Sequence, residues 1–181
     1  MIKLVPPLTE DAVRRLKAGD EVEITGIVYA ARDMAHKRLC ETIRASEPLP
    51  FDINGAIIYF TGPTPARPGR VIGAAGPTTS ARMDDFSPAL IEVGLRAMIG
   101  KGCRNQMVRD ALKKFGAVHL SAIGGAGALL SKFIVKAEII AYEDLGAEAI
   151  RKLVVENFPA IVAYDAAGQS IYDKWNIECR I

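Results

Sequence analysis

The stretch VIGAAGPTTSARMD, residues 71–84, joins an apolar run to a loop rich in hydrogen-bonding groups. Residues 71–75 predict a short buried strand, and Gly76-Pro77 predicts a tight turn directly after it. Polar side chains that follow a strand are typical of α/β proteins, in which ligands bind at the carboxyl edge of the sheet. The polar residues of this loop are Thr78, Thr79, Ser80 and Arg82.

The rest of the chain alternates between predicted strands and helices. Apolar and β-branched runs predict strands over residues 22–31, 56–61, 97–99, 118–123 and 134–141, and a final hairpin from residues 161–164 and 171–172. Capping residues and helical spacing predict helices over residues 10–17, 34–45 with Asp33 as N-cap, 89–93, and 106–115. We therefore predict an α/β fold whose chemically unusual loops gather at one edge of the sheet.

The hydroxyl-rich loop suits a small anion. Thr78, Thr79 and Ser80 offer hydroxyls and backbone amides, and the Arg82 guanidinium lies four residues after Thr78. Several donors that converge in this way bind a carboxylate or phosphate group. The alternative is a capped turn that only joins a strand to a helix, and the local residues favour neither interpretation.

Two more cationic positions follow predicted strands. Lys101 lies between two glycines, where the absence of side chains lets a substrate approach an ammonium that acts as counter-ion or acid. An ordinary exposed turn lysine is the alternative. Arg32 ends the strand over residues 22–31 and is followed by Asp33 and by His36, whose ring is a potential hydrogen-bonding partner of a substrate carboxylate.

Other motifs predict structural roles. The run Gly124-Gly125-Ala126-Gly127 does not complete the dinucleotide-binding pattern, and His119 lies in an apolar strand where a buried structural histidine is expected. The cysteines form neither an even set nor a CxxC pair, so we expect no disulfide framework and no metal or iron–sulfur site held by this chain alone. These cysteines are Cys40, Cys103 and Cys179.

Length and composition exclude several classes of protein. A chain of 181 residues predicts one domain over residues 1–181. Its 23 basic and 21 acidic residues are scattered, so we do not expect nucleic-acid binding. The uncharged stretch 116–131 is shorter than a membrane span of about 18 residues, and the N-terminus lacks the apolar region of a secretory signal, which favours a cytoplasmic protein.

Four segments occur in the order ARDMAHKR (31–38), FDING (51–55), GPTTSARM (76–83) and IGKG (99–102). Together they resemble the β subunit, or C-terminal domain, of iron–sulfur class I fumarate hydratases and of the related tartrate dehydratases. The likeness extends over residues 5–172. It implies a three-layer swivelling β/β/α domain. It also implies a partner α subunit, or a fused N-terminal domain, that holds a 4Fe–4S cluster, with a heterotetramer as the expected assembly.

The resemblance implies the reversible hydration of a small dicarboxylate, fumarate, to L-malate. Arg32 and Arg82 would then bind the substrate carboxylates, and Lys101 would pair with the substrate or its hydroxyl. Thr78 would assist proton transfer beside an acidic residue of the partner, because a threonine hydroxyl alone is a poor base at neutral pH. Lys101 and Thr78 are the implied catalytic residues.

Four further residues complete the implied site. Thr79 and Ser80 would add substrate contacts, and Asp33 and His36 would orient the neighbouring arginine. The same set suits L-tartrate or another hydroxy acid, because these substrates are also small dicarboxylates. A non-catalytic anion-binding module remains the alternative from a different class of protein.

Overall fold

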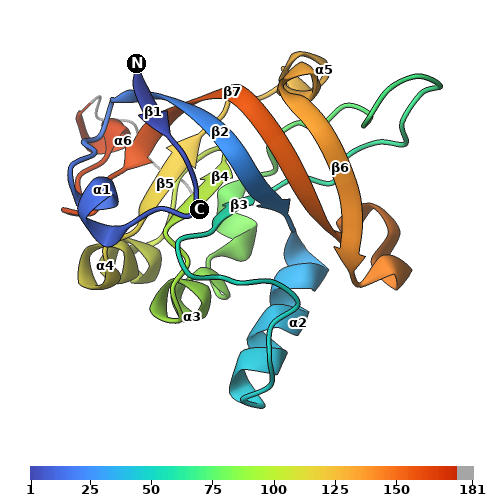
Figure 1. Ribbon diagram of the computed structural model, residues 1–181. Helices are drawn as coiled ribbons and strands as arrows, with labels where there is room; N and C mark the ends of the chain where they lie inside the picture. The colour runs from blue at the N-terminus through green and yellow to red at the C-terminus, as the bar shows by residue number, and fades with distance from the viewer. Residues whose placement is uncertain (175–181) are drawn as a thin grey trace.

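The computed structural model describes residues 1–174 and is built around a mixed sheet in the order β1–β2–β3–β4–β5–β7–β6 (Figure 1). Strands β1 to β5 pair with one another in parallel, whereas β7 is antiparallel to β2, β5 and β6. The predicted α/β class is therefore confirmed. The strands are β1 (Ile2–Leu4), β2 (Glu21–Ala30), β3 (Ile57–Tyr59), β4 (Ala97–Gly100), β5 (Val118–Ser121), β6 (Ile134–Ala141) and β7 (Ile150–Tyr164).

The long strand β7 closes the sheet on itself. It pairs with both β2 and β5, which are the two ends of the parallel series β2–β3–β4–β5. Gly26 interrupts the β2–β7 register with a φ of 134°, and a Cβ at that position would lie 3.2 Å from Pro6 Cδ. A glycine in a strand permits this kind of irregularity.

Alternate residues of the parallel strands enter two separate hydrophobic cores, as the two-residue period of a strand requires. Helices α2 (Asp33–Arg44), α3 (Ser87–Glu92) and α4 (Gln106–Phe115) lie together below the sheet in Figure 1. Their residues Leu39, Leu90 and Leu112 share a core with Ile58 and Met98. The second core combines Ile57, Tyr59, Ile99 and Leu120 with Leu153 and Phe158 of β7.

Side-chain hydrogen bonds cap the N-termini of two described helices, α1 (Glu10–Arg14) and α4. In α4 the Asn105 side chain accepts from Val108 N at 3.0 Å, and Gly116 ends the helix in the left-handed conformation, so the predicted bounds are confirmed. Helix α1 begins after Thr9 as predicted but is shorter. The prediction that Asp33 caps α2 is wrong: Arg32 is the N-cap, and Asp33 is the first helical residue.

Two predicted strands are absent from the described residues. Residues 71–75 belong to a loop that closes on itself where Thr64 N donates to Ala74 O (3.1 Å) and Ala74 N donates to Thr64 Oγ1 (2.9 Å). The predicted final hairpin is wrong in its second half, because after one bridge from Tyr164 to Ser170 the chain enters α6 (Ile171–Lys174). The remaining short helices are η1 (Ser80–Met83), α5 (Gly127–Leu130), η2 (Ser131–Phe133) and η3 (Glu143–Glu148).

The cysteines partly contradict the prediction made from their number. Cys40 is a free, buried thiol, but Cys103 is disulfide-bonded. Pairing depends on which thiols the fold brings together, which their count does not determine. Cys179 lies outside the described residues.

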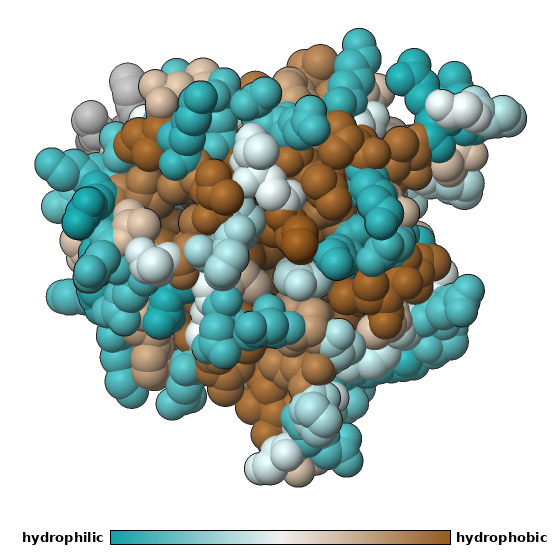
Figure 2. Space-filling view, in the orientation of Figure 1, coloured by the Kyte–Doolittle hydropathy of each residue, from teal (hydrophilic) through white to brown (hydrophobic). Residues whose placement is uncertain are grey.

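The surface of β6 is partly apolar. Val135 and Ile139 are 42% and 45% exposed, and Figure 2 shows hydrophobic surface on the side where Figure 1 places β6.

Among residues 1–174, no helix combines the length and apolar composition that crossing a membrane requires.

Candidate anion-binding site at the carboxyl ends of three parallel strands

The candidate site residues follow three neighbouring parallel strands. Arg32 lies two residues after β2, Lys101 comes directly after β4, and the 78–82 segment lies beside the ends of β3 and β4. Because carboxyl ends of parallel strands meet at one edge of the sheet, these segments are brought together although up to 69 residues separate them in sequence. The structure thus confirms the expected gathering of polar loops at one sheet edge.

Backbone hydrogen bonds dock the 78–82 segment onto the sheet. Thr78 N donates to Phe60 O at 2.7 Å, and Ser80 N donates to Lys101 O at 2.8 Å. In return Lys101 N donates to Thr78 O at 3.2 Å, and Thr79 forms a parallel bridge with Lys101. The segment therefore has a fixed register relative to Lys101.

Asp33 joins the two arginines of the predicted site. Its carboxylate accepts from Arg82 Nε at 2.8 Å and from Arg32 Nε at 3.4 Å. Burial by itself would raise the pKa of Asp33, but hydrogen bonds from its own backbone amide, Arg82 and Arg32 outweigh that effect and hold the pKa below its ordinary value. Glu148 adds a second carboxylate, 3.5 Å from an Arg32 terminal nitrogen.

His36 lies beneath this charged group and is completely buried. Its Nδ1 is 2.9 Å from Arg32 O, and because a carbonyl oxygen only accepts, Nδ1 carries the proton. Burial lowers the pKa of His36 to about 4, so the ring is neutral at pH 7. His36 therefore contacts the Arg32 backbone, and no described group hydrogen-bonds its buried Nε2.

Glycines make room for two of the cationic side chains. A Cβ at Gly62 would lie 2.8 Å from an Arg32 guanidinium nitrogen, and a Cβ at Gly124 would lie 3.3 Å from Lys101 Cδ. The glycine-rich turn also touches the start of the motif, where Ala75 N donates to Gly127 O at 3.1 Å. The run 124–127 is thus a close-packing element beside the site.

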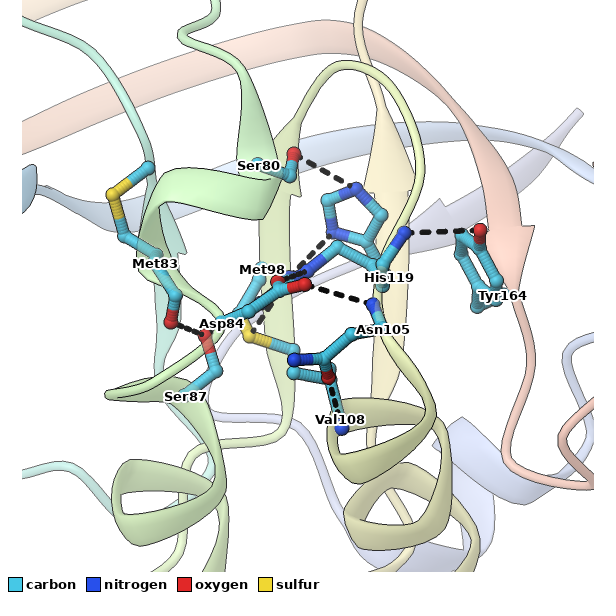
Figure 3. Close-up of polar contacts among 10 residues, drawn as sticks. Ser80, Met83, Asp84, Ser87, Met98, Asn105, Val108, His119 and Tyr164 are labelled. Carbon is cyan, nitrogen blue, oxygen red and sulfur yellow. Dashed lines mark hydrogen bonds and ion pairs between the residues drawn. The ribbon is translucent and has the colours of Figure 1, made fainter. Parts of the chain in front are cut away.

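The side chains of the 78–82 segment divide between surface and interior. Arg82 and Thr79 are exposed, Thr78 is half-buried, and Ser80 is completely buried. Ser80 Oγ lies 3.1 Å from His119 Nε2, which places its hydroxyl in the interior (Figure 3). The accessible groups are those of Arg32, Thr78, Thr79, Arg82 and Lys101, an open cationic surface suited to a small anion.

Within residues 1–174, no group of three or more His, Cys, Asp or Glu side chains has the arrangement of a metal site. An iron–sulfur cluster needs cysteine thiolates, and the two described cysteines are a buried free thiol and a disulfide-bonded residue. The described residues therefore do not fit such a cluster.

A family model described as "Fumarase C-terminus" matches residues 1–175. The chain belongs to this family. It is 39% identical over 175 residues to a Methanocaldococcus jannaschii protein with the provisional name L(+)-tartrate dehydratase subunit beta, covering 93% of this chain and 90% of that protein.

Two longer relatives of this fumarase C-terminus chain are fumarate hydratases. The anaerobic class I fumarate hydratase of Escherichia coli is 39% identical over 155 residues, and fumarate hydratase 2 of Leishmania major is 37% identical over 158 residues. These alignments cover 84% and 86% of this chain. The chain spans 28% of the length of each of these two proteins.

Three residues near the candidate site of this fumarase C-terminus chain were not predicted from the sequence. Glu148 pairs with Arg32 from a distant helix, Arg104 lies buried behind the 78–82 segment, and Gly124 borders Lys101. Arg104 follows the Gly100-Lys101-Gly102 motif by two residues, but a basic residue in a turn is ordinarily exposed. No local signal distinguishes it from a surface residue.

Proposed function

We propose that this chain is the β subunit of an iron–sulfur-dependent fumarate hydratase, which hydrates fumarate reversibly to L-malate. The observation that carries the proposal is the juxtaposition of Arg32 and Arg82 on one carboxylate, Asp33, beside Lys101 and Thr78. Two guanidinium groups at one sheet edge match the two carboxylates of a four-carbon dicarboxylate. The family to which the chain belongs supports the reaction class.

In this proposal each accessible residue has a role. Arg32 and Arg82 bind the two substrate carboxylates, with Asp33 orienting both guanidinium groups. Lys101 pairs with the substrate hydroxyl or carboxylate, and Thr78 helps to move a proton in concert with an acidic group from a partner. Thr79, which is exposed, contacts the substrate through its hydroxyl.

Two of the implied residues act from beneath the surface. Ser80 reaches the site only through its backbone, because its hydroxyl lies against His119. His36 holds the Arg32 carbonyl and thereby the start of α2. Both are positioning residues in this proposal.

We further propose that a separate α subunit, in a heterotetramer, holds the 4Fe–4S cluster, since the described residues of this chain offer no cluster ligands. The M. jannaschii relative carries a subunit name, which supports a two-chain enzyme. Ile123 and Leu129, 72% and 54% exposed, flank the glycine-rich turn beside Lys101. A partner that covered the site would bury them, which is favourable for apolar side chains.

The proposal includes three further expectations for the molecule. The closed sheet with helices on one side and β6–β7 on the other suits one swivelling β/β/α domain of three layers. The domain would occupy residues 1–181. A cytoplasmic location stays a prediction.

An L-tartrate dehydratase subunit is the second candidate. The M. jannaschii relative, whose length this chain nearly matches, has that activity in its name. Both substrates are four-carbon dicarboxylates, so the same two arginines suit either one.

The test is anaerobic co-expression of this chain with a neighbouring chain that carries three cluster cysteines, followed by turnover assays with fumarate, L-malate and L-tartrate. We expect hydratase activity in the complex and none in the isolated chain. Robust turnover by the isolated chain, verified free of host enzyme, would rule out the subunit role. A cluster-loaded complex inactive on all three substrates would favour the anion-binding module.

A further inference from the structure

A charged side chain lies fully buried directly behind the proposed substrate site. The Arg104 side chain has 0% exposure, and its Nε donates to Asp84 Oδ1 at 2.6 Å. A terminal nitrogen donates to Ser87 Oγ at 2.6 Å, and the guanidinium carbon lies 5.4 Å from the centre of the Phe60 ring. Phe60 is also the residue whose carbonyl accepts from Thr78 N.

The Asp84 carboxylate joins the two segments that carry the proposed substrate residues. Asp84 follows Arg82 by two residues, and its second oxygen accepts from Asn105 N at 2.7 Å (Figure 3). Arg104 and Asn105 follow Lys101 by three and four residues. One buried carboxylate therefore connects the end of the 78–82 segment to the chain just after Lys101.

A second connection runs through His119. Arg104 Nη1 lies 3.4 Å from His119 Nδ1, and His119 Nε2 lies 3.1 Å from Ser80 Oγ. Because a guanidinium only donates, Nδ1 accepts, and Nε2 carries the proton that is donated to Ser80. Burial, reinforced by the charge of Arg104, lowers the pKa of His119 well below its ordinary value, which keeps the ring in this neutral form.

Arg104 thus reaches the 78–82 segment at two points, through Asp84 just after its end and, by way of His119, through Ser80 in its middle. Burial of an ion pair carries a large desolvation cost, and well-packed apolar residues often stabilise a protein as much. What apolar residues cannot supply is a set of directional bonds to several partners at once. In return for its desolvation cost, the buried Arg104 guanidinium fixes the positions of its partners through directional bonds.

We propose that Arg104 is a positioning residue that fixes Thr78 and Arg82 relative to Lys101, without touching the substrate. The effect of Arg104 on catalysis rests on the proposed function. Its structural consequence, a rigid register between the 78–82 segment and Lys101, holds for the chain by itself. The two consequences are tested separately.

The structural test is hydrogen–deuterium exchange on the full-length chain. Arg104→Lys keeps the positive charge and loses the planar guanidinium with its several donors. Asp84→Asn combined with Arg104→Met removes both charges of the ion pair, so that no buried ion is left unpaired. We expect at least about tenfold faster exchange of the amides of Ser80 and Lys101 in both variants, with the β2–β7 amides unchanged. The control Asp165→Asn alters a buried carboxylate that binds Ala18 N, Ala167 N and Gln169 N and leaves the Arg104 contacts in place.

Exchange rates at Ser80 and Lys101 that match the wild type would overturn the proposal, as would an equal acceleration in the Asp165→Asn control. If Arg104→Lys does not fold, Ser80→Ala serves as the second variant, because it removes only the His119 connection. We expect it to accelerate the same amides to a smaller extent. No acceleration in that variant would remove the His119 connection from the proposal.

The catalytic test uses the reconstituted complex with equal cluster content in every variant. We expect Arg104→Lys to lower kcat/KM by about 100-fold, since a misplacement of about 1 Å has that effect, while Asp165→Asn leaves it unchanged. Wild-type turnover with an unaffected Arg104→Lys variant would refute the positioning role and leave the proposed function intact. A wild-type complex without turnover would refute the proposed function, and the exchange experiment would still decide the role of Arg104.

Discussion

Asp33 orients Arg32 and Arg82, the two arginines that are proposed to bind carboxylates. It accepts from Nε of each, so the guanidinium groups are held on one anion and keep their terminal nitrogens for other acceptors. Its pKa lies below the ordinary value, so the carboxylate is charged at neutral pH. The contribution of these pairs to stability is therefore fully present above about pH 4 and is lost as the pH falls through the lowered pKa.

Arg82→Ala should reduce kcat/KM of the reconstituted complex by about 10- to 100-fold, because a hydrogen bond to a charged group contributes about 1.5–3 kcal/mol. Arg82→Lys should restore little, since a lysine lacks the planar fork that reaches Asp33 and a substrate together. Steady-state kinetics check both variants. Arg38→Ala is the control, since Arg38 is an arginine that also pairs with a carboxylate, that of Asp144, and has no proposed role in the site. Wild-type kinetics in both Arg82 variants would remove Arg82 from the site.

Thr78→Ala and Arg32→Ala should separate kinetically. Proton transfer matters in the transition state, so Thr78→Ala should lower kcat more than it weakens binding, whereas a carboxylate pair already forms with bound substrate, so Arg32→Ala should weaken binding at least as strongly. The measurements are kcat and the Kd of succinate, a nonreacting dicarboxylate, with cluster content checked. A Thr78→Ala complex that keeps full kcat and binds succinate poorly would make Thr78 a binding group.

At the scale of secondary structure, the site depends on how closely the 78–82 segment approaches β4. Gly100 is the last residue of β4, and a Cβ there would lie 2.1 Å from Ser80 Oγ. No flexible rearrangement accommodates such an overlap, because Ser80 is fully buried and bonded to His119. A glycine at this position is therefore a requirement of packing between strand and segment.

Gly100→Ala should lower the free energy of unfolding by about 1–3 kcal/mol, the usual cost of overpacking a well-packed interior. Gly124→Ala is the matched control, because its Cβ would meet only the flexible Lys101 side chain, at 3.3 Å. Urea unfolding of the two variants checks the comparison. Equal stability of Gly100→Ala and wild type would show that the segment yields more easily than its contacts indicate.

At the scale of the whole molecule, both histidines of the chain are buried and neutral. Burial lowers the pKa of His36 to about 4 and that of His119 well below its ordinary value, whereas histidines of the unfolded chain titrate near 6.5. Between these values the unfolded chain binds more protons than the folded one. Stability therefore falls as the pH falls from about 6.5 towards 4, and is greatest above 6.5.

The expected slope is about 1.4 kcal/mol per pH unit for each histidine, reached below pH 6. Urea unfolding at pH 7, 6 and 5 measures it, in a range where most carboxylates are not yet protonated. His36→Asn, which keeps a donor near the Nδ1 position, should reduce the wild-type slope by about half. Identical slopes in the two proteins would show that His36 does not contribute.

The sequence by itself determined the ends of those helices and strands that depend on residues a few positions away. The bounds of α4, set by the cap at Asn105 and the stop at Gly116, and the bounds of β6 match their predictions, because capping and strand periodicity act over a few residues. The placement of Arg32, Lys101 and the 78–82 segment at one sheet edge also followed from the order of strands and loops. Residues 71–75 were predicted wrongly because apolar residues pack in loops as well as in strands, as buried Ile72 and Ala75 do.

Only the tertiary structure decided which groups meet across long separations. The closure of the sheet by β7, the bridge from Asp33 to Arg82 and the buried contacts of Arg104 join residues that are distant in sequence. The burial of Ser80, against the expectation of a substrate contact, follows from the absence of a side chain at Gly100. Local propensity is a property of a few successive residues, whereas these contacts exist only once the parallel strands have aligned their carboxyl ends.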